Sequence, residues 1–402
     1  MTPTRKPSSS RERLLAVCRY QEPDHVPLLL HPFGWTPWWP CTWSDDQVAQ
    51  ARAFLDFGLD AWLTVGPPMV FHPDVRVHQR IETLPGERWP CMVKEYDTPA
   101  GVLRQEVFLT DDWVADEWPG HKGGPPTVNL LDDYNVVRYR RCPIQGEEDL
   151  GKLRYLYRPI PDDRVNQFRE HVSAMAGHAR KLGVILRAQA SAGGDAAMWL
   201  CGTTALLDMA IEQPELFEGL LDVIHAREKR DVEILSDMPV DLIMRRGYYE
   251  GTAFWSPEIY RRSVLPRFKE LTRLAHQAGK LMGYTMSVGY MPLLKELLEV
   301  GYDLHWLLDP LHSGGRPVDL AAVKAEWRGR IAVLGAINQP ITLAGGDPQK
   351  VRAEVVRAVR ELGPGGGLGL CPVEAIHNFT PPASLVAMIE AWKETREYPL
   401  RL

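Results

Sequence analysis

Eight short apolar segments recur along the chain, and each ends in polar residues or in glycine and proline. They occupy residues 26–31, 61–65, 184–189, 242–246, 281–286, 303–308, 331–337 and 367–371. Most of them are separated by stretches in which apolar residues recur at helical spacing. Strands that alternate with helices are typical of parallel βαβ units with right-handed crossovers. Eight such units predict an α/β fold of the (β/α)8, or TIM, barrel type.

Helix boundaries are marked by capping residues and prolines. Ser256 offers an N-cap, Pro257 suits the first helical position, and apolar residues follow at helical spacing until Gly279. Pro348 opens another helix, which ends ahead of the three glycines at 365–367. Because these glycines precede a strand and not a helix, they predict a turn and not a phosphate-binding loop.

The stretch 67–164 interrupts the alternation. Strand-like pieces at 93–96, 101–108 and 136–139 lie between turns rich in proline, glycine and aspartate. Because the stretch follows the second predicted strand, we expect an insertion at the C-terminal mouth, where barrel enzymes keep their catalytic groups. The chain 1–402 is then one barrel domain with an inserted cap or lid at 67–164. A surface elaboration without a role at the site fits the pattern equally well.

Composition and charge exclude several classes of protein. The 402 residues are 45% hydrophobic and 24% charged, which is typical of a globular enzyme. A net charge of −6 without a basic stretch disfavours nucleic-acid binding. No apolar run is long enough to span a membrane and the first ten residues lack a secretion signal, so we expect no membrane contact and a cytoplasmic location. The six cysteines are widely separated, which favours reduced thiols over disulfides.

Several short stretches, taken in order, resemble the uroporphyrinogen decarboxylase superfamily. They are RERLLA at 11–16, EPDHVP at 22–27, SPE at 256–258, LEVGYD at 298–303, GAIN at 335–338, GGG at 365–367 and TPP at 380–382. Together they span nearly the whole chain, and they are most similar to the branch of corrinoid-linked (methylcobamide:coenzyme M type) methyltransferases. The resemblance implies a (β/α)8 barrel that moves a methyl group between a small methylated substrate and a corrinoid carried by a separate partner protein.

The residues that define the two best-known branches of this superfamily differ here. The thiol-methylating branch holds zinc with a His-x-Cys pair on the fifth strand and a cysteine after the eighth, whereas this chain has Tyr284-Thr285-Met286 and a segment with Cys371 and Glu374. Cys371 or Glu374, together with His31, are the candidate ligands of a rearranged metal site, with zinc as the candidate ion. The decarboxylase branch uses an aspartate after the second strand, where this chain has Val65-Gly66. The resemblance therefore implies a divergent member with its own substrate.

The barrel rule selects polar residues at the ends of the predicted strands as candidates. Tyr284 is a candidate proton donor, and Asp309 is placed to orient His312 as a general base. Each has a plainer interpretation, namely a buried tyrosine with a satisfied hydroxyl and an aspartate that caps its own loop. Cys371 is equally a small buried hydrophobe. The candidates for substrate binding are Trp35, Gln189, Arg245, Arg246, Tyr249 and Asn338.

Three functions follow. The first is methyl transfer between a small methylated substrate and a corrinoid protein. The second is a metal-independent decarboxylase or lyase in which Arg245 or Arg246 holds a carboxylate. The third is a barrel that binds a small-molecule ligand without catalysis. All three assume that His31, one of the two arginines and Tyr284 meet with His312 and Glu374 around one cavity.

Overall fold

The computed structural model describes residues 8–31, 46–111, 128–190, 192–313, 316–377 and 379–400. Trp35, a predicted substrate-binding residue, lies outside the described residues. The chain divides into two compact units, and each is described by itself. Unit 1 comprises residues 1–66, 166–190 and 232–402, and unit 2 comprises residues 67–165 and 191–231. No helix in the described parts of the chain combines the length and the apolar character needed to cross a membrane.

Unit 1 contains a seven-stranded sheet in which every pair of neighbouring strands is parallel. The strands pair in chain order, and seven of the eight predicted segments form them. They are β1 (Trp62–Val65), β6 (Ile185–Gln189), β7 (Leu242–Arg246), β8 (Leu281–Thr285), β9 (Leu304–Leu308), β12 (Ala332–Asn338) and β13 (Leu368–Val373). Short apolar runs between helical patterns therefore located the parallel sheet to within two residues of each strand end.

The remaining predicted segment, 26–31, which is the first along the chain, forms isolated bridges and not a regular strand. Leu28 pairs in parallel with Leu370 of β13, and Leu29 pairs in parallel with Asp60, just ahead of β1. The prediction of a full strand is wrong here, in part because Pro27 has no amide hydrogen to donate to a ladder. The segment nevertheless forms hydrogen bonds with the chain at both edges of the sheet, from Leu29 N to Leu370 O (3.0 Å) and from Asp60 N to Leu28 O (3.0 Å).

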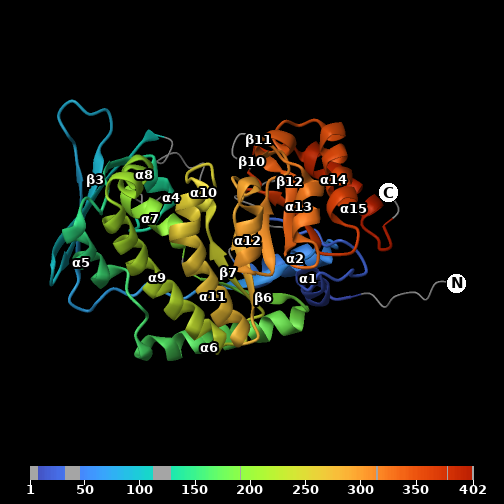
Figure 1. Ribbon diagram of the computed structural model, residues 1–402, viewed down its shortest axis with the longest axis horizontal. Helices are drawn as coiled ribbons and strands as arrows, with labels where there is room; N and C mark the ends of the chain where they lie inside the picture. Colours follow the sequence, from blue (N-terminus) through green and yellow to red (C-terminus); the bar gives the residue numbers. More distant parts are fainter. Residues whose placement is uncertain are drawn as a thin grey trace. The chain divides into compact units, whose positions relative to one another are not determined.

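The helices of unit 1 follow the strands along the sheet. Figure 1 shows α11 (Leu265–Gln277), α12 (Leu294–Val300) and α13 (Leu320–Trp327) in chain order beside the strands. The remaining helices that lie entirely within the unit are α1 (Ser10–Cys18), α2 (Gln47–Asp56), α10 (Pro257–Ile259), α14 (Pro348–Leu362) and α15 (Pro382–Thr395), whereas α6 (Asp162–Leu182) and α9 (Pro214–Ser236) continue from one unit into the other. The helix predicted from Pro257 is present, with Ser256 accepting a hydrogen bond from Ile259 N, but a π turn over Tyr260–Val264 interrupts it. Pro266 explains the interruption because it has no N–H to give to the carbonyl one turn earlier.

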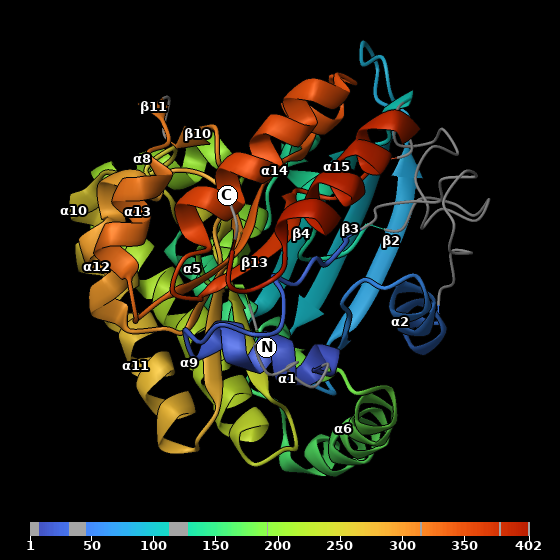
Figure 2. The same ribbon diagram turned by 90° about the vertical axis from the view of Figure 1, so that its right-hand side faces the viewer.

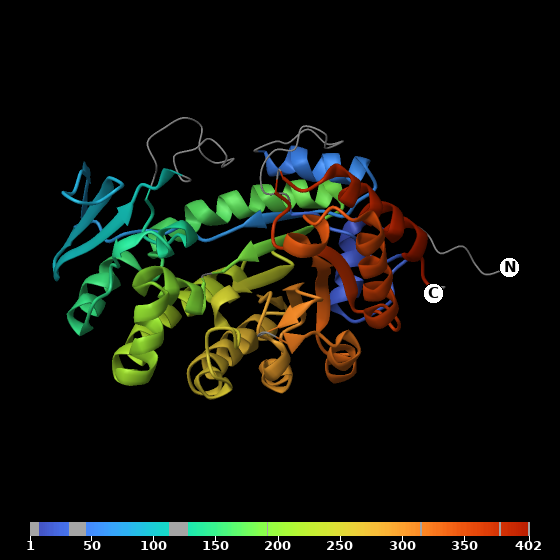
Figure 3. The same ribbon diagram turned by 90° about the horizontal axis from the view of Figure 1, so that it is seen from above.

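The sheet of unit 1 is curled, so its two faces have different surroundings. Side chains from β6, β7, β9, β12 and β13 pack into one core cluster that includes Met244, Trp306, Leu334 and Cys371. Strands that are not neighbours share a cluster only on the concave side, which we call the inner face. Residues that alternate with these point to the outer face, against helices such as α11 and α14. Figure 3 shows the yellow-to-red helices outside the strands.

Unit 2 contains a four-stranded antiparallel sheet in the order β2-β3-β4-β5. The strands are β2 (Arg76–Glu82), β3 (Cys91–Thr98), β4 (Gly101–Phe108) and β5 (Tyr139–Arg141), and the first three lie side by side in Figure 2. Its helices are α4 (Asp133–Val136), α5 (Glu147–Leu156), α7 (Gly193–Cys201) and α8 (Thr203–Glu212). The strand predicted at 136–139 is wrong in part, because Asp132 accepts a hydrogen bond from Tyr134 N and caps a short helix there. A lid function for 67–164 stays a prediction.

Candidate active site

Polar and aromatic side chains meet on the inner face of the unit 1 sheet. We call this group the inner-face cluster. Its members are His31, Trp62, Thr64, Arg187, Arg246, Thr285, Trp306 and Cys371. The strand register places Thr64 opposite Arg187, and it places Arg246, Thr285 and Trp306 side by side on β7, β8 and β9. Arg246 and Thr285 are the last residues of their strands, at the end of a parallel α/β sheet where enzymes of this architecture carry their chemistry, whereas Arg187 and Trp306 lie in the middle of theirs.

Arg187 lies at the centre of the inner-face cluster. Its guanidinium carbon is 4.3 Å from the ring centre of Trp62 and 4.4 Å from that of Trp306. Its Nε donates a hydrogen bond to Thr64 Oγ1 at 2.9 Å. Arg187 is 9% exposed, and within the described parts of the chain no carboxylate forms an ion pair with it. This buried cation, held by two aromatic rings and a neutral hydroxyl, is therefore without a counter-ion among the described residues.

Four buried polar atoms of the cluster have no hydrogen-bond partner among the residues that the structure describes. They are His31 Nδ1, Arg187 Nη1, Thr285 Oγ1 and Trp306 Nε1. Buried polar groups in folded proteins are nearly always paired, because leaving one unpaired costs about 1–3 kcal/mol. The ring of His31 lies 5.5 Å from that of Trp306, which in turn contacts Arg187. Other buried polar atoms of the described chain also lack a partner, but these four lie together on one face beside a buried cation, which makes the cluster the candidate ligand site.

The protonation states in the cluster are fixed near neutral pH. Burial lowers the pKa of His31 to about 4, and the charges of Arg187 and Arg246 lower it further in the same direction. Burial also raises the pKa of the Cys371 thiol to about 12 and lowers the pKa of Arg187 to about 10. At pH 7 the cluster therefore holds a neutral imidazole, a protonated thiol and a charged guanidinium.

Solvent reaches the inner face near the cluster. On β1 the inner-face residues Trp62 and Thr64 are half-buried, whereas Leu63 and Val65 on the outer face are buried. The last residues of β6 and β7, Gln189 and Arg246, are also half-buried on the inner face. The core of the sheet is thus closed below these positions and accessible at them, as a binding site requires.

Tyr284 and Arg245, two predicted site residues, lie on the other face. Arg245 donates to both carboxylate oxygens of Glu250, with 2.7 Å between Nη2 and Oε1, and the hydroxyl of Tyr284 donates to the same carboxylate. All three are buried, and Phe268 of α11 lies 4.5 Å from the Tyr284 ring between centroids. Consecutive strand residues point to opposite faces, so Arg246 points inward where Arg245 does not. The structure does not bring Tyr284 and Arg245 together with His31.

Asp309 and His312 do not form the predicted base pair. His312 is exposed, and the carboxylate of Asp309 accepts hydrogen bonds from the backbone amides of Leu311 (2.7 Å) and His312 (3.2 Å). Asn338 donates to the other oxygen of Asp309 at 2.9 Å. Asp309 is thus a loop cap, as the plainer interpretation has it, and burial raises its pKa. Asn338, a predicted substrate-binding residue, supports this loop cap through its hydrogen bond to Asp309.

The predicted metal ligands His31, Cys371 and Glu374 do not form a metal site. Among the residues that the structure describes, no group of three or more His, Cys, Asp and Glu side chains is arranged to hold an ion. The Cys371 thiol faces the carbonyl of Pro372 at 3.4 Å, and the groups whose charges act on His31 are Arg187, Arg246 and His377. The zinc site that the sequence resemblance implies for the thiol-methylating branch does not fit either, because Tyr284 of the matching segment donates a hydrogen bond to Glu250.

Of the remaining predicted residues, Gln189 ends β6 on the inner face but donates its amide to the carbonyls of Ala190 and Met244, both at 3.2 Å. Tyr249 is half-buried and packs edge-on against Phe254 at 5.3 Å. Sequence analysis missed Arg187, although a signal exists. It is an arginine in the middle of a mostly apolar strand. It lies two residues from both Ile185 and Gln189, so its side chain points to the same inner face as theirs.

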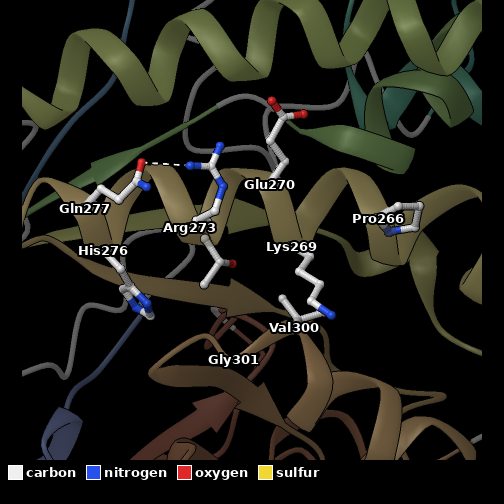
Figure 4. Close-up of a pocket in the computed structure, with 9 residues that line it drawn as sticks. Pro266, Lys269, Glu270, Arg273, His276, Gln277, Val300 and Gly301 are labelled. Carbon is white, nitrogen blue, oxygen red and sulfur yellow. Dashed lines mark hydrogen bonds between the residues drawn. The ribbon is translucent and has the colours of Figure 1, made fainter.

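A second hollow of about 690 Å3 lies on the helical side of unit 1, along α11 and the end of α12 (Figure 4). Its charged side chains are exposed and already paired, as Arg273 with Gln277 (2.8 Å), His276 with Asp303 (2.8 Å) and Lys269 with Glu299 (2.8 Å). Thr272 Oγ1, which lines this hollow, is also buried without a hydrogen-bond partner among the described residues, but the cations that line the hollow, Lys269 and Arg273, are exposed.

Comparisons with known proteins agree with the resemblance found in the sequence. The uroporphyrinogen decarboxylase (URO-D) family profile matches residues 140–395. No curated protein matches the chain. Among solved structures, a methyltransferase from Methanosarcina mazei is similar over 96% of this chain and 99% of its own, with 16% identity and a TM-score of 0.55. A D-psicose 3-epimerase from Clostridium cellulolyticum H10 is similar over 61% and 85%, with 11% identity and a TM-score of 0.35. At such identities the first similarity establishes a shared fold.

Proposed function

The chain belongs to the uroporphyrinogen decarboxylase (URO-D) family, and from this premise we propose that it is a metal-independent carboxy-lyase whose reaction centre is the inner-face cluster. The observation that carries the proposal is the set of four buried polar atoms around Arg187 that, within the described parts of the chain, lack a partner, as Arg187 lacks a counter-ion. The proposal includes closure of the unit 1 sheet into a (β/α)8 barrel through segment 26–31, which bonds to the chain at both edges.

The charge of the cluster favours a reaction that builds negative charge on the substrate. In decarboxylation the bond between a carbon and its carboxylate breaks, CO2 leaves, and the electron pair left on the carbon takes up one proton. Arg187 and Arg246 place positive charge beside the uncharged His31, so the site suits an anionic substrate. A fixed charge that is not engaged with a spectator group of the substrate stabilises a developing carbanion without reorganisation. The two indoles that flank Arg187 keep water away from the guanidinium.

The carboxy-lyase proposal is tested with a mixture of cellular organic acids and mass spectrometry. Chelator-treated protein is expected to convert at least one acid into a product that lacks one CO2. We expect Arg246→Gln to lose this conversion and Arg273→Gln, a change in the exposed hollow on α11, to keep it. Conversion that requires added metal, or that Arg246→Gln leaves unchanged, would contradict the proposal.

Methyl transfer is the second candidate, because the shared fold with a methyltransferase extends over nearly the full length of both chains. A phenolate or alkoxide that leaves a methyl group also gains negative charge, so the same two arginines suit it. To test this, the protein is mixed with methoxylated acids and with reduced cobalamin, which stands in for a corrinoid partner. Methyl transfer then produces the visible spectrum of methylcobalamin. A barrel without catalysis would bind acids and pass neither test.

A further inference from the structure

We propose that Arg187 anchors a carboxylate that the substrate keeps throughout the reaction, so that the substrate is an organic acid with a second, reacting group. The inference rests on the proposed function for the place of the reaction, and it adds the substrate class and the residue that selects it. Arg187 lies on β6. It is far along the chain from Trp35, the predicted substrate-binding residue that follows the first predicted strand.

The immediate surroundings of Arg187 leave one edge of the guanidinium for a ligand. Trp62 and Trp306 lie 4.3 and 4.4 Å from the guanidinium carbon, and Nε is engaged by Thr64 at 2.9 Å. Nη1 is buried and has no partner. Arginine has no acceptor capacity and remains charged, so only an anion or a strong acceptor satisfies this edge.

A carboxylate fits this edge better than a phosphate does. One guanidinium edge matches the two oxygens of a singly charged carboxylate, through a pair of parallel hydrogen bonds. The other unpaired atoms nearby, His31 Nδ1, Thr285 Oγ1 and Trp306 Nε1, are all on neutral groups. They suit the uncharged polar atoms of the same ligand, whereas a dianion requires more charge than one free edge supplies.

The anchored carboxylate is not the one that leaves. A carboxylate that departs as CO2 loses its charge in the transition state, so a strong ion pair would stabilise the substrate more than the transition state and slow the reaction. A buried guanidinium therefore promotes the reaction only when its carboxylate stays charged throughout. Arg187 then holds one end of the substrate while the change occurs at the other end.

The test uses the full chain and a carboxylate that cannot react. Isothermal titration at low salt and pH 7 measures binding of benzoate, of uncharged benzamide and of phenyl phosphate. The variants are Arg187→Met, which removes the charge at similar length, Arg187→Lys, which keeps the charge without the planar fork, and Arg273→Gln as the matched arginine control. Thermal melting with and without benzoate reports folding and binding together.

We expect benzoate to bind wild type and Arg273→Gln and to raise their melting temperatures. Its affinity is expected to fall tenfold or more in Arg187→Met and by a smaller factor in Arg187→Lys, and benzamide is expected to bind at least tenfold more weakly than benzoate. Equal benzoate affinity in wild type and Arg187→Met, no benzoate binding to wild type, or tighter binding of phenyl phosphate than of benzoate would overturn the inference. If Arg187→Met does not fold, Arg187→Lys decides, and unchanged affinity there overturns it.

The two proposals fail separately. Benzoate binding through Arg187 without any release of CO2 from organic acids would reject the carboxy-lyase and keep the anchor. In the converse case, Arg187→Met still releases CO2 from its acid, and its KM is unchanged. That result would keep the carboxy-lyase and reject the anchor.

Discussion

Arg245 on β7 and Arg187 on β6 lie on neighbouring strands of the same sheet but have opposite environments. On the outer face, Arg245 is buried and paired with both oxygens of Glu250, which also accepts the hydroxyl proton of Tyr284. On the inner face, Arg187 is also buried but faces no carboxylate among the described residues. A complete network stabilises a fold, whereas a buried cation without a counter-ion costs stability and is kept for a ligand. The presence or absence of a partner carboxylate thus separates the environment of Arg245 from that of Arg187 among the described residues.

The largest expected effect comes from breaking the outer network. Arg245→Met leaves the buried Glu250 carboxylate without its cation, and removal of one partner from a buried ion pair costs about 3–5 kcal/mol. Urea titration should show that loss in the free energy of unfolding. Arg246→Met, next in the chain but half-buried on the inner face, serves as the control and should cost less than half as much. An equal loss in the two variants would contradict the distinction between the faces.

A second effect concerns pH. Burial raises the pKa of Glu354 to about 7, with Asn338 N (2.6 Å) and Thr342 Oγ1 (2.8 Å) as its hydrogen-bond partners. Because the folded pKa is higher than the usual value near 4.5, the protonated form favours folding, and this contribution is lost as the pH rises from about 4.5 through 7. We expect a decrease of about 2–3 kcal/mol over that range. Glu354→Gln should flatten the profile, and an unchanged slope would show that another group controls it.

A smaller effect is expected from Tyr284→Phe. The variant removes one hydrogen bond to Glu250 but leaves the ion pair with Arg245, so it should cost about 1–2 kcal/mol of stability. Benzoate affinity should not change, because the hydroxyl lies on the outer face. A loss of benzoate binding in this variant, with folding intact, would place Tyr284 at the site after all.

The smallest effect on stability is expected from Arg187→Met without ligand. Removal of a buried charge that has no counter-ion among the described residues is favourable, and this gain offsets the loss of the contacts with Thr64 and the two indoles. The melting temperature should therefore remain within about 2 °C of wild type. Differential scanning calorimetry measures it. A decrease as large as that of Arg245→Met would show that Arg187 is a structural residue.

The sequence predicts the sheet of unit 1 far better than the site. Apolar runs such as 242–246 and 331–337 mark buried parallel strands directly, because their side chains are covered on both faces. Segment 26–31 has the same apolar content, but Pro27 limits its pairing to isolated bridges. β2 was missed because nearly all its residues are exposed, so no apolar run marks it.

The site depends on which face each residue occupies, and position near a strand end does not reveal it. Tyr284 and Arg245 were selected by that rule, yet alternation places them outside and Arg246 inside. Arg187 is not at a strand end, and its importance follows from Trp62 and Trp306, which come from strands far along the chain. Only three-dimensional contacts show that its charge has no protein partner.

The most direct test is a crystal structure of the full chain soaked with 4-bromobenzoate, in which the bromine reports the position of the acid. We predict an anomalous bromine signal on the inner face, with the carboxylate bonded to Arg187 Nη1 and its ring toward His31 or Thr285. A signal confined to the hollow on α11, or none on the inner face, would contradict the assignment of the inner-face cluster as the ligand site.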